Sequence, residues 1–559
     1  MTQPERQPWV DGLTIWRALA ATATRFGGQD ALVFPALGLR WSYAELLRRV
    51  DEAATGLAAL GVVQGDHVAV WATNVPEWVV LQFATARLGA VLVTVNPAYR
   101  EHELRYVLAQ SDATVLFLVD RFKTSDYFAI LAQAVPELAR SQPGRLQAAE
   151  FPRLRWVVAL RGEPPAGTIS FQEMCARGRA LLPEPNLNEV EGRLHPHDPI
   201  NIQYTSGTTG FPKAAMLSHR NLLLNAYYVG ECQRLGPTDR MCIPVPFYHC
   251  FGCVLGTLCA VVHGAAMIIP ADAFQPNATL AAIEQERATV IYGVPTMFIA
   301  ELQDPSFAQR NLRSLRTGIM AGSPCPIEVM RQVVDRMGAR EMTIAYGQTE
   351  ASPVITQTRV DDPLELRVET VGRPLPGVEV KLVEPGTGRV LGDNEQGELC
   401  ARGHVVMLGY YKNPEATAEA IDAEGWLHTG DLATRLPNGY YKITGRIKDM
   451  VIRGGENIYP REIEEFLYTH PDIEQAAVVG VPDPKYVEEL CAWIKLKAGR
   501  TLTEQEVRDF CRAHLAHYKV PRYVRFVEAF PQTVTGKIQK FRIREQMMRE
   551  LGLEDQRTA

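Results

Sequence analysis

The sequence predicts an α/β protein built from several folding units, and three observations lead to that prediction. The chain has 559 residues, more than one ordinary hydrophobic core accommodates. Helical patterns alternate with short apolar runs from about 40 to 190 and again from about 191 to 370. From about 371 to 445 the chain becomes β-rich and glycine-rich, and a shorter α/β unit follows. Such alternation is typical of parallel sheets with helices on their faces.

The stretch EWVVLQFATARLGAVLVTVNP shows the alternation within the first half. An apolar-striped helix ends at Leu88, Gly89 turns the chain, and a buried strand runs from Ala90 to Asn96. Other apolar runs bounded by Gly or Pro are expected strands. In chain order they are VLFLV, LRWVVAL, MCIPVP, AAMIIP, ATVIYGVP, LRTGIMAG, VEVKLV, GELCARG, YYKITG, QAAVVGVPD, CAWIKLK and YVRFVEAF.

Composition narrows the class of protein. A net charge of -6 disfavours general nucleic-acid binding, so we expect no nucleic-acid partner. The N-terminal residues show no apolar segment with a cleavage signal, which predicts a cytoplasmic protein. The most apolar run, 252–271, is divided by His263 and Gly264, so it predicts a buried helix and strand rather than a transmembrane segment. The C-x-x-C of Cys250 and Cys253 has no second pair at zinc spacing, and we interpret both as buried hydrophobes.

The stretch YTSGTTGFPKAAMLSH, residues 204–219, predicts a phosphate-binding loop without Walker spacing. It follows the strand-like INIQY and precedes a helix expected to begin near Ser218. Its glycines let backbone N–H groups approach an anion, its hydroxyls donate, and Lys213 adds a charge. A solvent linker would explain the Gly and Thr residues but not the Pro212–Lys213 pair between apolar elements.

Four later motifs can complete a nucleotide site. In AYGQTEAS, Tyr346 can stack on a base, while Thr349 and Glu350 can hold a phosphate and Mg²⁺. MAGSPCP offers close approach to a base or an acyl chain. Asp431 in WLHTGDLA and Arg446 in GRIKD suit the hydroxyls of a ribose, and Lys537 in TVTGK can act as a mobile cation. Each motif alone has a structural explanation, such as a β-turn or a core tyrosine, but together and in this order they favour a site.

These motifs resemble those of the adenylate-forming superfamily, and the resemblance runs from WSYAELLRRV to the C-terminal lysine region. VNPAYREHELRYVLAQSDATVLF, PFYHCFG and IYGVPTMF are most similar to the medium-chain acyl-CoA synthetases and their bacterial fatty-acid relatives. The resemblance implies two αβαβα-type subdomains plus a small β-barrel-like subdomain in an N-terminal domain, 1–447. It implies a small mobile α+β C-terminal domain, 448–559.

The resemblance also implies a reaction. ATP and a fatty acid, medium- to long-chain, give acyl-AMP and pyrophosphate, and coenzyme A then gives acyl-CoA and AMP. The alternatives are an acyl-AMP ligase that loads a carrier protein, an aromatic-acid CoA ligase, and a silent acyl-nucleotide binding protein. A homodimer is left open.

Site residues carry over by position. The catalytic set is Lys537, Thr205, Lys213, Glu350 and His249, with Mg²⁺ on Glu350 and the hinge at Lys448. The nucleotide set is Thr205, Ser206, Gly207, Thr208, Thr209, Gly210, Phe211, Pro212, Lys213, Gly322, Ser323, Pro324, Tyr346, Gly347, Gln348, Thr349, Asp431, Arg446 and Lys537.

The expected acyl pocket is apolar or small in its lining, which suits an aliphatic acid. Its walls are His249, Phe251, Gly252, Tyr292, Gly293, Pro295, Thr296 and Ala321. No acidic residue follows His249 until Asp272, which disfavours an amino-acid substrate. Coenzyme A phosphates are expected to meet Arg453, Lys540, Arg542 and Arg544. Val487 stands where the family usually has glycine; because valine resists positive φ, we expect a turn of different shape there.

Overall fold

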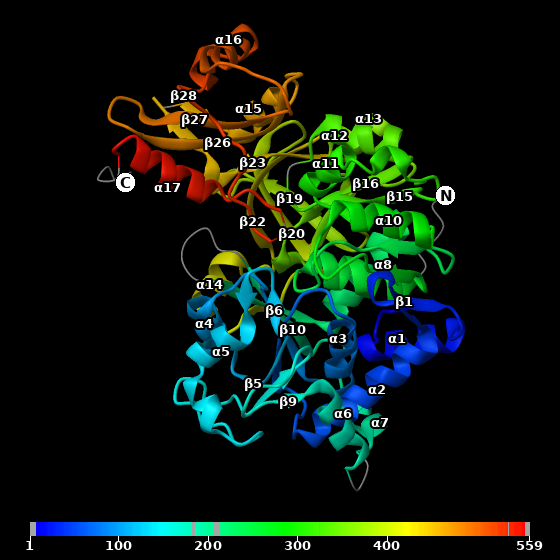
Figure 1. The fold of residues 1–559 in the computed structure, drawn as a ribbon. Helices are drawn as coiled ribbons and strands as arrows, with labels where there is room; N and C mark the ends of the chain where they lie inside the picture. The colour runs from blue at the N-terminus through cyan, green and yellow to red at the C-terminus, as the bar shows by residue number, and fades with distance from the viewer. Residues whose placement is uncertain are drawn as a thin grey trace.

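The computed structural model describes residues 7–181, 185–205, 212–323, 325–454, 456–534 and 536–553. The predicted site residues Ser206 to Phe211 and Pro324 lie outside the described residues. Figure 1 shows a large N-terminal domain and a small C-terminal domain, which carries β26–β28 and α15–α17. Among the described helices, none combines the length and the apolar character that a bilayer crossing requires.

The first large sheet has nine strands, and its six central strands run parallel. Antiparallel strands close it at both edges, as β2 on one side and β17 and β18 on the other. Its strands in spatial order are β18 (Arg373–Pro374), β17 (Val354–Gln357), β16 (Glu341–Gly347), β15 (Thr317–Ala321), β14 (Val290–Gly293), β12 (Arg240–Cys242), β13 (Ala266–Ile268), β1 (Asp30–Phe34) and β2 (Leu39–Ser42).

The second large sheet has eight strands, of which six are parallel. In spatial order they are β21 (Gly409–Tyr410), β11 (Lys213–Ser218), β10 (Pro199–Thr205), β4 (Val91–Val95), β3 (His67–Trp71), β5 (Ala113–Leu118), β8 (Trp156–Ala159) and β9 (Ile169–Ser170). The two sheets therefore do not correspond to the segments before and after about residue 190. The strands β1 and β2 join the later sheet, and β10, β11 and β21 join the earlier one.

Helices cover these sheets as the alternation predicts. The helix α3 (Pro76–Leu88) begins with Pro76 in its first turn and ends at Gly89, which is left-handed with φ 68°. The helix α8 (His219–Cys232) begins after Ser218, whose side chain accepts from the backbone N–H of Asn221. The 252–271 run forms a π-helix, η3 (Phe251–Leu258), then α9 (Cys259–His263) and the buried strand β13. The predicted buried helix and strand are confirmed.

Other helices of the N-terminal domain complete the layers. They are α1 (Ile15–Phe26), α2 (Tyr43–Ala59), α4 (Glu101–Ser111), α5 (Tyr127–Ala134), α6 (Phe171–Arg179), α7 (Leu187–Gly192), α10 (Pro276–Glu286), α11 (Pro295–Gln303), α12 (Ile327–Gln332), α13 (Leu364–Glu369) and α14 (Pro414–Ala420).

The β-rich segment forms a four-stranded antiparallel sheet, which Figure 1 shows beside the C-terminal domain. Its strands are β19 (Val378–Val383), β20 (Gln396–Gly403), β22 (Leu427–Arg435) and β23 (Tyr441–Arg446). The C-terminal domain has a five-stranded sheet and three α-helices. These elements are β24 (Val451–Arg453), β25 (Glu456–Ile458), α15 (Pro460–Leu467), β26 (Ile473–Asp483), β27 (Val487–Leu496), α16 (Glu504–His514), β28 (Tyr523–Phe526) and α17 (Lys540–Glu550).

The C-terminal sheet buries both faces. Val478 packs with residues of α15 and α16 in one core, and its neighbour Val479 packs with residues of α17 in another. This alternation follows from the two-residue period of a strand. The small domain thus has a hydrophobic core on each side of its sheet, separate from that of the N-terminal domain.

The turn at Val487 does not change shape to suit valine. Val487 has φ 72°, in the left-handed region that a β-branched residue rarely adopts. The β26–β27 hairpin fixes the turn, because the backbone N–H groups of Lys485 and Tyr486 both donate to Asp483 Oδ1 at 2.9 Å. The expectation of an altered turn was wrong at the level of the backbone, and valine accepts the strain instead.

We therefore expect Val487→Gly to stabilise the hairpin. Relief of left-handed strain is worth roughly 1–2 kcal/mol, against about 0.5–1 kcal/mol for the added freedom of glycine in the unfolded chain. The measurement is amide hydrogen exchange over 473–496, which should slow, together with thermal unfolding. Val390 is also exposed and lacks a positive φ, so Val390→Gly is the matched control and should only destabilise. Faster exchange in Val487→Gly would contradict the strain argument.

Candidate active site

Lys537 is held in a tight turn that the C-terminal domain presents to the N-terminal domain. The backbone N–H of Thr533 donates to the Lys537 carbonyl at 2.8 Å, and the Lys537 N–H donates to Thr533 Oγ1 at 3.0 Å. Gly536 has φ 80°, and a Cβ there would lie 2.6 Å from Thr296 Oγ1. Only glycine fits this approach, and the Thr296 hydroxyl donates to the Gly536 carbonyl at 3.4 Å. The turn therefore fixes Lys537 against the first residues of α11.

The Lys537 side chain lines a small cavity of mostly apolar residues. The lining is Val245, Pro246, His249, Phe251, Val294, Met297, Gly322 and Lys537. Burial lowers the pKa of Lys537 below its ordinary value, and the charges of Glu350 and Asp431 oppose that effect in part. The cavity volume is about 10 Å³, so an acid can enter only if some lining side chains move.

His249 is a neutral imidazole with a fixed tautomer. The backbone N–H of Phe251 donates to His249 Nδ1 at 3.1 Å, so the proton of the neutral ring is on Nε2. Burial, reinforced by the nearby Lys537 charge, lowers the pKa of His249 to about 3. A neutral His249 can donate one hydrogen bond to a substrate oxygen, but it supplies no positive charge near neutral pH.

Three residues predicted for the nucleotide meet in one cluster. The Tyr346 hydroxyl at the end of β16 donates to Asp431 Oδ2 at 2.8 Å. Arg446 Nε donates to Asp431 Oδ1 at 2.8 Å, from the position directly across the β22–β23 pair. The Asp431 charge raises the pKa of Arg446 above its ordinary value, and Asp431 itself is buried. The structure thus brings together an aromatic ring, a carboxylate and a guanidinium.

Glu350 and Lys213 share a partner that sequence reasoning missed. Glu350 lies in η6 (Thr349–Ala351), just after β16, and the Tyr410 hydroxyl donates to its Oε1 at 2.8 Å. Lys213 Nζ lies 5.1 Å from the centroid of the Tyr410 ring. Tyr410 is on β21, which pairs with β11 at the edge of the sheet. The only sequence signal was the aromatic pair in GYYKNP.

The ends of the phosphate loop form a hairpin. Thr205 and Lys213 are opposite each other at the ends of β10 and β11, and Thr205 Oγ1 donates to the Lys213 carbonyl at 3.4 Å. The sequence predicted a strand, a loop and then a helix. The structure inserts the strand β11 before α8, because 213–218 pairs with both β10 and β21. Of the nucleotide residues predicted between Thr205 and Lys213, the structure describes Thr205, Pro212 and Lys213.

Only some of the expected acyl-pocket walls line the cavity. His249 and Phe251 do, as does the nucleotide residue Gly322. Tyr292 lies behind Phe251, with ring centroids 5.7 Å apart, and its hydroxyl accepts from Gln233 Nε2 at 3.0 Å. Gly252 packs against the backbone, since a Cβ there would lie 2.2 Å from the Pro246 carbonyl oxygen. Val245, Val294 and Met297, which do line it, were missed because local sequence patterns do not reveal which side chains face a cavity.

Most of the basic residues expected to meet coenzyme A have carboxylate partners in this conformation. Arg453 pairs with Glu489 at 2.8 Å, Lys540 with Glu464 at 2.7 Å and Arg544 with Glu488 at 2.9 Å. Lys448 lies in the short η7 (Ile447–Asp449) between β23 and β24. An acceptor that uses these cations would have to compete with their intramolecular pairs.

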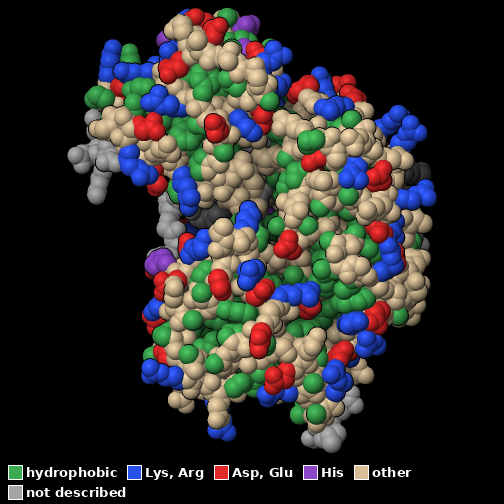
Figure 2. Space-filling view, in the orientation of Figure 1, with side chains coloured by type: hydrophobic (Ala, Val, Ile, Leu, Met, Phe, Trp, Pro, Cys, Tyr) green, Lys and Arg blue, Asp and Glu red, His purple; other side chains and the backbone are tan. Residues whose placement is uncertain are grey.

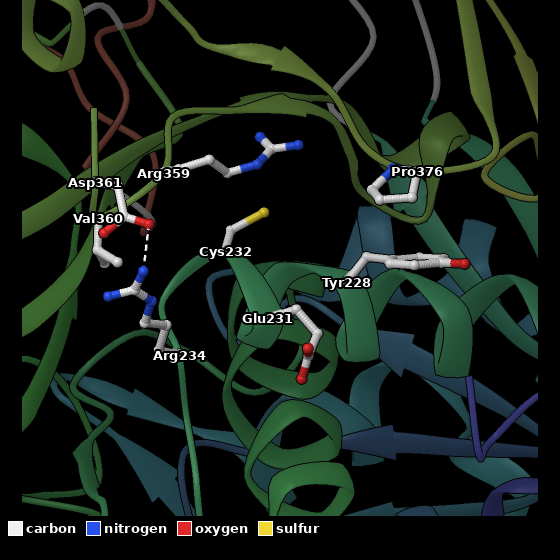
Figure 3. Close-up of a pocket in the computed structure, with 8 residues that line it drawn as sticks. All are labelled: Tyr228, Glu231, Cys232, Arg234, Arg359, Val360, Asp361 and Pro376. Carbon is white, nitrogen blue, oxygen red and sulfur yellow. Dashed lines mark hydrogen bonds and ion pairs between the residues drawn. The ribbon is translucent and has the colours of Figure 1, made fainter. Parts of the chain in front are cut away.

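A second cavity, of about 150 Å³, lies away from these residues at the C-terminal end of α8. Figure 3 shows Arg234 paired with Asp361 at one side of the lining residues, and Tyr228, Glu231 and Cys232 projecting from the helix. Its charges are largely matched within the lining. Figure 2 likewise shows Lys and Arg side chains interspersed with Asp and Glu over the visible face, which does not favour a polyanionic partner.

Comparisons with known proteins identify the class: an AMP-forming enzyme that activates carboxylic acids and transfers them to coenzyme A. The chain belongs to the AMP-binding enzyme family: the profile of that family matches residues 19–411, and its C-terminal domain profile matches 462–537. It is 51% identical over 540 residues to YngI of Bacillus subtilis (strain 168), which is named as an acyl-CoA synthetase. That comparison covers 97% of this chain and 98% of YngI. It is 42% identical to the mitochondrial medium-chain acyl-CoA ligase ACSF2 of Homo sapiens, covering 97% and 89%.

Solved structures agree with the architecture. The anthranilate CoA ligase AuaEII with anthranoyl-AMP gives a TM-score of 0.86 at 26% identity, covering 97% of this chain and 98% of that chain. ATP-bound MatB from Rhodopseudomonas palustris gives 0.80 at 30%, covering 95% and 98%. The predicted fold class is confirmed, and the protein is an AMP-forming acid–CoA ligase.

Proposed function

We propose that the protein activates a fatty acid of medium to long chain as acyl-AMP and then forms the fatty acyl-CoA. The observation that carries the proposal is one juxtaposition: Lys537 of the C-terminal domain reaches a cavity that combines His249 and apolar walls, beside the Asp431 cluster. The apolar walls can pack against an alkyl chain, and the positive charge of Lys537 can stabilise a carboxylate and a phosphate as they are joined.

The first step joins two anions. A carboxylate oxygen attacks the α-phosphorus of ATP, the bond to the bridging oxygen breaks, and pyrophosphate leaves. Lys537 stabilises the negative charge that develops on the carboxylate and the α-phosphate. Lys213 and the backbone N–H groups of the phosphate loop bind the leaving pyrophosphate. Asp431 and Arg446 hold the ribose, and Tyr346 stacks on the adenine. The Nε2–H group of His249 donates a hydrogen bond to a carboxylate oxygen of the fatty acid.

Glu350 suits Mg²⁺. Its carboxylate provides the oxygen ligands that Mg²⁺ prefers, and Tyr410 orients one oxygen and leaves the other available. When bound, the ion neutralises phosphate charge.

The second step needs a different arrangement. The thiol of coenzyme A attacks the acyl carbon, AMP leaves with the bonding electron pair, and the thiol proton goes to solvent. Lys537 fills the space beside His249 that a thiol would need, so the C-terminal domain has to move. We propose that the domains meet at 447/448 and that Lys448 is the hinge.

The function is tested with ATP, Mg²⁺, coenzyme A and a panel of straight-chain, aromatic and amino acids, with AMP, ADP and thioester measured. We expect AMP and acyl-CoA in equal amounts, with the highest kcat/KM for fatty acids. A preference for aromatic acids would replace the proposed substrate class. Thioester formation only with a carrier protein would replace coenzyme A as the acceptor.

Tyr292 is expected to limit the acyl chain length. Its ring stands behind Phe251 and is fixed by the buried Gln233, so its removal extends the pocket toward α8. We expect Tyr292→Ala to raise the kcat/KM ratio of longer to shorter acids at least tenfold, since a methylene in a hydrophobic pocket is worth about 1–3 kcal/mol. The measurement is a chain-length profile on folded protein.

Tyr292→Phe is the matched control, because it removes the hydroxyl but keeps the ring; its profile should stay like that of the parent. An equal loss of rate with every acid in Tyr292→Ala would show that Tyr292 supports the core and does not limit length.

A further inference from the structure

Three potential metal ligands converge on the outer part of the four-stranded sheet. His428 Nδ1 lies 2.9 Å from Glu398 Oε2 and 3.4 Å from Cys400 Sγ. Cys400 and His428 are direct neighbours across the β20–β22 pair, and Glu398 precedes Cys400 by two residues, on the same face. All three donor atoms lie within 4.8 Å of one another, the one such group of three His, Cys, Asp or Glu residues in the described part of the chain.

The outer partners of these ligands are already in place. Glu398 Oε1 accepts from the Gly430 N–H at 3.0 Å, which leaves Oε2 directed at His428. On the far side of the ring, Asp422 Oδ2 lies 3.6 Å from His428 Nε2. A carboxylate at the remote nitrogen orients a metal-bound imidazole and increases its basicity. This face is partly open, since the His428 side chain is 32% exposed and Glu398 14%.

The Cys400 thiol has two long contacts, one to His428 Nδ1 at 3.4 Å and one to the Glu398 carbonyl oxygen at 4.0 Å. A cation between Glu398, Cys400 and His428 would engage a lone pair of each donor atom. We propose that Glu398, Cys400 and His428 bind one divalent transition-metal ion of the zinc class, with a solvent molecule as fourth ligand. Sulfur with imidazole selects zinc over Mg²⁺, which prefers oxygen ligands alone. Binding releases the thiol proton of Cys400 to solvent.

The proposed metal site contacts the residue next to Asp431, the proposed ribose-binding residue. Glu398 holds the Gly430 N–H, and Gly430 precedes Asp431 in β22. An ion bound by Glu398 would therefore affect the position of Asp431 on the same strand. This effect on activity rests on the proposed function, but the metal-binding test below does not.

The test is a Co²⁺ titration of the full chain without ATP or Mg²⁺, followed by displacement with Zn²⁺. We expect the thiolate-to-cobalt charge-transfer absorption to saturate at one equivalent and to disappear when Zn²⁺ is added. Cys400→Ser and His428→Gln should each remove it, and Asp422→Asn should weaken binding about 10- to 100-fold. Cys175→Ser removes a buried thiol of α6 and should leave the titration unchanged.

Cys400 is fully buried, so far-ultraviolet circular dichroism checks each variant. If Cys400→Ser does not fold, the half-exposed His428→Gln carries the same test. The proposal is overturned if no absorption appears at one equivalent, if it persists in the folded Cys400→Ser or His428→Gln variants, or if Cys175→Ser removes it.

Discussion

Lys537→Ala is expected to lower the rate of acyl-AMP formation by about 10² to 10³, and to leave thioester formation from supplied acyl-AMP close to that of the parent. Loss of one positive group at a site of developing negative charge costs about 3 kcal/mol. In the proposed mechanism the lysine is required only while carboxylate and phosphate are forced together, because the second step starts from a neutral anhydride carbon. Pyrophosphate release and acyl-CoA formation, measured as separate half-reactions, check this.

The pH dependence adds a test of the same residue. Burial lowers the pKa of Lys537, so its positive form is lost at a lower pH than that of an exposed lysine. The kcat/KM for adenylation should therefore fall on an alkaline limb below the ordinary lysine pKa. Lys537→Arg keeps the charge at every working pH, and the limb should disappear. Equal loss of both half-reactions in Lys537→Ala would contradict a role confined to adenylation.

The fold could be predicted because its strands carry local signals. Runs such as ATVIYGVP are apolar, β-branched and ended by Gly or Pro, and β14 forms there. Sheet membership could not be predicted, since pairing depends on contacts between residues far apart in the chain. Leu32 pairs with Met267, for example, and nothing local in either segment indicates it. The strand β11 was missed because residues 213–218 lie directly between a loop motif and a helix, and we did not expect a separate element there.

Part of the site could be predicted for a different reason. Tyr346, Asp431 and Arg446 belong to compact motifs with unusual residue combinations, and the structure places them in contact. Tyr410 belongs to no such motif, and the motif IYGVPTMF that contains Met297 does not indicate that this side chain faces the cavity; only the folded chain brings both residues to the site. At Val487 the residue's own preference was stated correctly, since valine disfavours a positive φ. The prediction failed because the hairpin imposes a positive φ there.

Glu350→Gln is expected to reduce acyl-AMP formation by about 10² to 10³ and to raise the Mg²⁺ concentration needed for half-maximal rate. The substitution keeps the shape of the side chain and its acceptor for Tyr410, but it removes the negative charge that a hard cation requires. Loss of charge stabilisation on the transferring phosphate has the same order of effect as loss of one preorganised donor. Initial rates over a range of Mg²⁺ at saturating ATP measure both changes.

Tyr410→Phe separates the charge of Glu350 from its orientation. It removes one hydrogen bond to the carboxylate, worth about 1.5–3 kcal/mol when one partner is charged, and retains the ring beside Lys213. We expect a loss of rate smaller than that of Glu350→Gln with a modest shift in Mg²⁺ dependence. If Glu350→Gln lowers the rate but leaves the Mg²⁺ dependence unchanged, Glu350 acts through Tyr410 and the position of β21, and the metal is held elsewhere. A double variant no slower than Glu350→Gln alone would show that Tyr410 acts only through that carboxylate.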